Sequence, residues 1–129
     1  MKEKSIKYTF FIAAFWNWSI GIILIILSTF FLSDVAPIFG ITIPPSLIFL
    51  HGLCVLVVVI GVGFFIVGLN PTENRGLIVM GIIEKYSIFL VFLIYFLLGD
   101  TNLFGLLIAI GDLLLGIIFT RILIENKKN

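Results

Sequence analysis

The chain has 129 residues with a formal net charge of +1, and 61% of them are hydrophobic. A mean hydropathy of +1.30 excludes an ordinary soluble domain, and a nearly neutral chain without a basic cluster gives no support for nucleic-acid binding. One cysteine, Cys54, and one histidine, His51, exclude an internal disulfide, a His/Cys zinc site and a haem with two histidine ligands within one chain. We therefore expect no metal and no cofactor.

Four apolar stretches are long enough to cross a bilayer, whose hydrocarbon core of about 30 Å needs about 20 helical residues. We place them at 8–32, 46–69, 76–98 and 102–124. The connecting segments are short, so neighbouring helices must run in opposite directions. The sequence predicts an all-α fold, with residues 1–129 forming a single antiparallel four-helix transmembrane bundle.

The first stretch follows Lys2, Lys4 and Lys7, as the apolar part of a signal peptide would. It is too long for a signal sequence, however, and it lacks a small-residue cleavage site. We expect an uncleaved first membrane helix.

The connections carry turn residues. Pro37 and the pair Pro44-Pro45 predict an irregular loop between the first two helices, with Ser46 as the N-cap of the second. Residues 70–73 are predicted to form a turn, because Pro71 cannot continue a helix. Residues 99–102 read as a tight hairpin, which makes the last two helices antiparallel neighbours.

Basic residues mark one side of the bundle. Seven of the eight lie before the first helix, between the second and third, or at the tail: Lys2, Lys4, Lys7, Arg75, Arg121, Lys127 and Lys128. In the other two loops the only charged residues are Asp34 and Asp100, which are both acidic. The positive-inside rule therefore predicts that both termini are cytoplasmic.

Small residues form stripes along the helices, which lets membrane helices approach closely. The clearest are Ala13, Asn17 and Gly21 in the first helix, and Gly105, Ala109, Asp112 and Gly116 in the last. We expect these faces to point inward. The fourteen phenylalanines we assign to the lipid-facing surface.

Ionisable residues lie in the middle of two spans, where each costs about 2.5 to 3.5 kcal/mol on insertion scales. Counted from the cytoplasmic ends at 1.5 Å per residue, Asn17, Glu84, Lys85 and Asp112 all lie about 14–15 Å deep. We predict that they meet in one polar layer, with Lys85 paired to Asp112, Glu84 holding a proton and Asn17 as a hydrogen-bonding partner.

This layer predicts a polar pocket at mid-membrane, with Asn17, Glu84, Lys85 and Asp112 as the ligand-binding or proton site. The expected pocket wall consists of Trp16, Trp18, Gly61 and Tyr95. A buried ion pair that only fixes the register of the helices is the plainer alternative.

Several short motifs together resemble the DoxX-like proteins, a loosely defined group of small four-helix bacterial membrane proteins. They are Ala14-x-x-Asn17-x-x-x-Gly21, Gly61-x-Gly63-Phe64 with the later Asn70-Pro71, Gly81-x-x-x-Lys85, and Asp112 among glycines. The resemblance implies a bacterial cell-membrane protein of a mostly uncharacterised group. The name-giving member is linked to a terminal quinol oxidase complex. This chain lacks the early arginine of the first helix and the intramembrane glutamate of the second, so the resemblance carries no quinone link.

The leading functional hypothesis is a non-enzymatic membrane protein that binds a small lipophilic ligand or serves as an accessory subunit of a membrane complex. Its expected partners are membrane lipid, a lipophilic small molecule, and a membrane protein or a second copy of the chain. The alternative is a small proton-coupled transporter using Glu84, Lys85 and Asp112. A third hypothesis is an enzyme that uses Glu84 and Asp112 as acid and base. No nucleophile, metal or cofactor motif in the sequence supports it.

Overall fold

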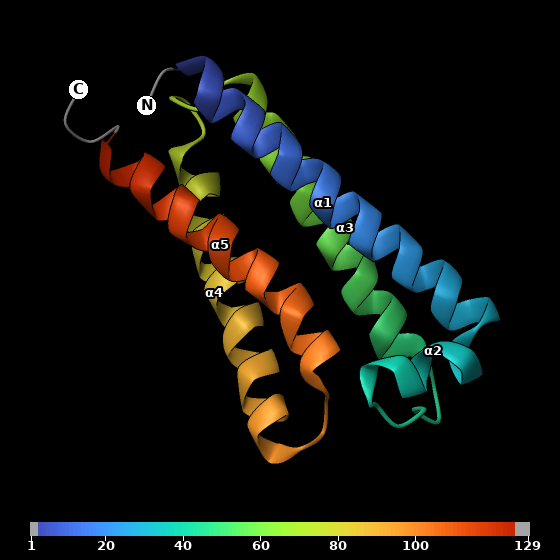
Figure 1. Ribbon diagram of the computed structural model, residues 1–129. Coiled ribbons are helices and arrows are strands. Elements are labelled where there is room, and N and C mark those ends of the chain that lie inside the picture. Colours follow the sequence, from blue (N-terminus) through green and yellow to red (C-terminus); the bar gives the residue numbers. More distant parts are fainter. Residues whose placement is uncertain (1–2, 126–129) are drawn as a thin grey trace.

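The computed structural model describes residues 3–125, which form an all-helical bundle (Figure 1). In chain order the helices are α1 (Glu3–Phe30), α2 (Leu32–Phe39), α3 (Ile48–Leu69), α4 (Arg75–Leu98) and α5 (Leu103–Glu125). Four of these, α1, α3, α4 and α5, are long and apolar enough to cross a membrane, which confirms the predicted fold class. Lys2, Lys127 and Lys128 of the predicted charge pattern lie outside the described residues.

Helix α1 begins five residues before the predicted start. Hydropathy detects only the apolar part of a helix, whereas backbone hydrogen bonding continues through its polar first turns. Glu3 and Lys7 stabilise these turns as an ion pair one turn apart, with 2.9 Å between Oε1 and Nζ.

The bundle consists of two helix pairs. Helix α1 packs along α3 and α4 packs along α5, while the two pairs touch each other much less. Figure 1 shows the pairs converging where α1 begins and α5 ends, and diverging toward α2. We call these the terminal end and the α2 end of the bundle.

Glycines bring α1 and α3 close together. A Cβ atom at Gly21 would lie 2.6 Å from Cγ2 of Val58 and 2.9 Å from the carbonyl oxygen of Cys54, so no larger residue fits. Gly61 on α3 is covered in the same way by the Trp18 indole of α1. The stripe of small residues predicted in the first helix is therefore a helix–helix contact.

A stack of phenylalanines closes the terminal end. Phe10, Phe64 and Phe119, from α1, α3 and α5, are fully buried. The Phe10 and Phe119 rings are stacked with centroids 4.5 Å apart, and Phe64 meets Phe119 edge-on at 5.2 Å. Ile78 of α4 joins the same core. The prediction that the phenylalanines face lipid is wrong for these three, because a bundle with so many small residues needs bulky rings to fill its interior.

The segment between the first two long helices contains a helix that was not predicted. Pro37 lies inside α2, in the last turn, where its fixed φ is compatible with a helix and it costs only one backbone hydrogen bond. Gly40 then ends the helix in a left-handed conformation, with φ of 68°. Residue 47, not the predicted Ser46, is the N-cap of α3. The Ser46 hydroxyl accepts only a long hydrogen bond of 3.4 Å from the backbone N–H of Ile48.

Hydrogen bonds tie α2 to the start of α5. Gly99, with φ of 83°, ends α4 and opens the predicted hairpin, after which the chain passes α2. The Thr101 hydroxyl donates to the carbonyl oxygen of Phe39 at 3.0 Å, and the Asn102 amide donates to that of Ile38 at 2.7 Å. We call these two bonds the latch. It joins the helix pairs at the end where their long helices diverge.

Candidate functional site

Four polar side chains from three helices meet at the middle of the bundle. The Lys85 ammonium on α4 donates to Oδ1 of Asp112 on α5 and to Oδ1 of Asn17 on α1, both at 2.7 Å. It also lies 3.3 Å from Oε2 of Glu84. The structure thus brings together all four residues of the predicted layer. Asn17 is a hydrogen-bonding partner of Lys85 within this group.

The surrounding helices hold this polar cluster in place. The Asn17 amide donates to the carbonyl oxygen of Val57 on α3 at 3.3 Å, which fixes its oxygen toward Lys85. The Phe64 ring lies 5.5 Å from the ammonium and contributes a cation–π contact. Gly116 leaves room for the aliphatic stem of Lys85, since a Cβ there would lie 3.2 Å from the lysine Cβ. The absence of a side chain at Gly116 thus allows a lysine to fit into the packed interior.

The acids of the cluster are less completely buried than its cation. The Lys85 side chain is 1% exposed, whereas those of Glu84 and Asp112 are 13% and 11% exposed. Oε2 of Glu84 is itself buried and makes no hydrogen bond to any described residue. Two carboxylates and one ammonium leave the cluster with a charge of −1 when all are ionised, which is unfavourable in a low dielectric. The cluster therefore has unused capacity to accept hydrogen bonds.

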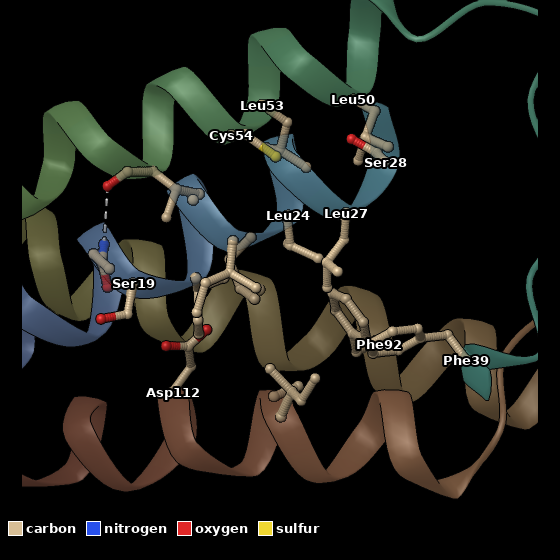
Figure 2. A pocket seen from close by; sticks show the side chains of 18 of the residues that line it. Ser19, Leu24, Leu27, Ser28, Phe39, Leu50, Leu53, Cys54, Phe92 and Asp112 are labelled. Atoms are coloured by element: carbon tan, nitrogen blue, oxygen red, sulfur yellow. Dashed lines mark hydrogen bonds between the residues drawn. The ribbon is translucent and has the colours of Figure 1, made fainter. Parts of the chain in front are cut away.

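A cavity of about 480 Å³ lies between the two helix pairs, and the polar cluster forms one end of it. Its walls are almost entirely apolar, as Figure 2 shows for Leu24, Leu27, Leu53 and Phe92. At the other end the cavity reaches α2, where Phe39 projects toward it (Figure 2). The phenylalanine stack separates the cavity from the terminal end of the bundle. The site is an apolar chamber with a single polar end.

One of the four residues of the predicted pocket wall lines the cavity. Trp16 lines the cavity and packs on Gly111 of α5. Trp18 instead lies between α1 and α3, where its indole N–H donates to the carbonyl oxygen of Val58 at 3.1 Å and its ring covers Gly61. Tyr95 is 52% exposed and borders a separate, smaller hollow near the 99–102 turn. The two tryptophans lie on different faces of α1, because residues two positions apart in a helix are rotated by about 200°.

Sequence reasoning missed most of the chamber. Its wall includes Cys54 and α2, the segment that was predicted to be an irregular loop. Ser28 also lines it, and the Ser28 hydroxyl is 3.1 Å from Nε2 of His51. This contact satisfies His51 between α1 and α3, away from the polar cluster. Only the glycine and alanine stripes indicated which faces border the interior.

Comparison with protein-family models, with characterised proteins and with solved structures finds no match to this chain. The site has to be interpreted from its own geometry.

Proposed function

We propose that this protein binds a small lipophilic molecule within the membrane, in the chamber between its two helix pairs. The observation that carries the proposal is an apolar cavity of about 480 Å³ that ends on a buried polar cluster. Ligand sites of about 300–1,000 Å³ with apolar walls and a few convergent polar groups are typical of small-molecule binding. Ionisable residues inside a membrane are costly and commonly serve a function.

The simpler role, an ion pair that only fixes helix register, explains Lys85 and Asp112 but not the chamber beside them. A register pair needs close packing around it on all sides. Here the packing is close only on the side of Phe64 and Gly116, whereas the other side borders the cavity. This asymmetry supports a binding site over a structural pair.

The first experiment compares two neighbouring substitutions on α1. Leu27 lines the cavity, whereas Ile26 is 47% exposed on the outer surface of the bundle. The purified protein is analysed by native mass spectrometry for a retained lipid or other lipophilic molecule. Leu27→Phe is expected to lower its occupancy at least fivefold, and Ile26→Phe is expected to leave it unchanged. Equal retention by both variants, or a wild-type protein that retains no such molecule, would contradict the proposal.

We also propose that the protein lies in a bacterial cell membrane with both termini cytoplasmic, as a DoxX-like protein would. The charge pattern supports this: Lys4, Lys7, Arg75 and Arg121 lie at the helix ends of the terminal end. The α2 end would then face outward.

Cysteine labelling of intact cells tests the orientation. In a Cys54→Ser background, Asp34→Cys and Asp100→Cys are expected to react with an impermeant maleimide from outside. Glu73→Cys, in the exposed turn before α4, is expected to react only after permeabilisation. The reverse pattern would contradict the orientation.

A second candidate function is proton-coupled transport, and one observation favours it. The chamber extends from Glu84 to α2, while Phe64 of the phenylalanine stack lies on the other side of Lys85, as expected for a transporter resting in one of two access states. Opening toward the other side would require the phenylalanine stack to part. Proton flux into proteoliposomes that is the same for wild type and Glu84→Gln would remove this candidate.

A further inference from the structure

The nitrogen donors of the polar cluster, on Lys85 and Asn17, are buried and largely used within the protein. The Lys85 side chain is 1% exposed, and Asn17 is equally buried. Two of the three ammonium donors are taken by Asn17 and Asp112 at 2.7 Å. The side chains of the cluster that stay partly exposed are those of Glu84 and Asp112, at 13% and 11%. A ligand head that approaches the cluster therefore meets these two acids first.

When all of its groups are ionised, the cluster carries a net negative charge, as its partly exposed acids do. Lys85 is the only cation of the cluster, and it faces two acids, one at 2.7 Å and one at 3.3 Å. An ionised carboxylate has about four lone-pair positions for hydrogen bonds. Asp112 uses Oδ1 for Lys85, and Oε2 of Glu84 makes no hydrogen bond to the described residues. A positively charged donor would neutralise the excess acid, whereas an anionic head would add to it.

The rest of the chamber sets the shape of the ligand. Along α1 the cavity wall runs from Asn17 to Ser28, which is about 16 Å at 1.5 Å per residue. Between these residues the wall is built of leucine, isoleucine and glycine, with Ser19 beside the polar end. Such a chamber takes an apolar tail that lies parallel to the helices, with its head at mid-membrane.

We infer that the ligand is an amphiphile with one apolar tail and a positively charged, hydrogen-bond-donating head, of the long-chain amine class, held by Glu84 and Asp112. The inference rests on the lipophilic binding proposed above and specifies which molecules that site selects. Fatty acids, whose heads are anionic, are rejected by the same carboxylates.

Three probes of equal chain length test this selection: decylamine, decanol and decanoate. Trp16 serves as the fluorescent reporter in a Trp18→Phe protein, because Trp16 lines the cavity and Trp18 does not. A Trp16→Phe protein, which keeps only the tryptophan outside the chamber, is the control for partitioning into the micelle. Titrations are carried out in a neutral detergent at pH 7.

Decylamine is expected to change the Trp16 fluorescence in a saturable way, with a half-saturation concentration at least about tenfold lower than that of decanol or decanoate. The reason is that charged hydrogen bonds contribute tenfold or more in affinity. Glu84→Gln is expected to reduce this preference below about threefold. For a variant that does not fold, native mass spectrometry of the wild type with an equimolar mixture of the probes gives the same ranking.

Decanoate or decanol binding as tightly as decylamine would overturn the inference and leave lipophilic binding standing. Saturation by none of the three, in both the fluorescence and the mass spectrometry, would overturn the inference and the proposed function together. Saturable binding of decylamine with the same preference in Glu84→Gln would contradict the role given to Glu84.

Discussion

The terminal half of the bundle and the α2 half are built from the same kinds of residue but are packed differently. In the terminal half, aromatic rings from three helices meet around Phe119, and the two helix pairs are in close contact. In the α2 half, the pairs diverge around a cavity of about 480 Å³ and are joined by the latch. The polar cluster lies at the boundary. The comparison indicates that one half holds the pairs together while the other provides the site.

The largest effects are expected at that boundary. Lys85→Met alone leaves the carboxyls of Asp112 and Glu84 without their cation, which costs about 3–5 kcal/mol. The double substitution with Asp112→Leu is expected to cost less than Lys85→Met alone, because apolar packing replaces the pair and one acid, Glu84, is left instead of two. A double-mutant cycle on the free energy of unfolding in micelles measures the difference. A Lys85→Met protein as stable as wild type would show that the pair contributes no coupling.

The two halves are expected to respond differently to the loss of a ring. Phe119→Ala removes a fully buried ring and leaves a void, at a cost of about 3 kcal/mol. Phe92→Ala, in the chamber wall, is expected to cost about 1 kcal/mol, since one face of that ring already borders the cavity. The same unfolding measurement compares them. Equal costs would mean that the α2 half is packed as tightly as the terminal half.

The smallest expected effect concerns the latch. Asn102 both caps α5, by accepting from the N–H of Phe104 at 3.0 Å, and donates to α2. Asn102→Asp keeps the acceptor and removes the donor, whereas Asn102→Ala removes both. We expect Asn102→Asp to cost about 1 kcal/mol and to speed hydrogen exchange in α2, with little change in α5. Unchanged exchange in α2 would show that the latch does not restrain it.

The polar cluster could be predicted because an ionisable group in a membrane needs a partner at its own depth. Counting along the helices was enough to bring Asn17, Glu84, Lys85 and Asp112 together. The chamber could not be predicted in this way. In lipid, an inward Leu27 and an outward Ile26 are equally apolar, so hydropathy does not separate a cavity wall from the lipid-facing surface. The buried phenylalanines were missed for the same reason.

Helix α2 was not predicted, because several prolines in a short segment usually indicate that the segment is not helical. Pro37 lies inside an eight-residue helix, where it removes one backbone hydrogen bond. The neighbouring residue Ala36 is only 1% exposed, and α2 packs against α1 and α5. This packing holds the short helix in place. Tertiary contact, which a single sequence does not display, decides between loop and helix here.

The position of the Lys85–Asp112 pair has a consequence for how the protein enters the membrane during synthesis. Both residues lie on α4 and α5, so the second helix pair carries its own neutralising partner and can insert as a unit. Asn17 is likewise bonded to Val57 within the first pair. The Lys85, Asp112 and Asn17 side chains are thus each partnered within their own helix pair, and the bond from Lys85 to Asn17 is one that only docking of the two pairs can form.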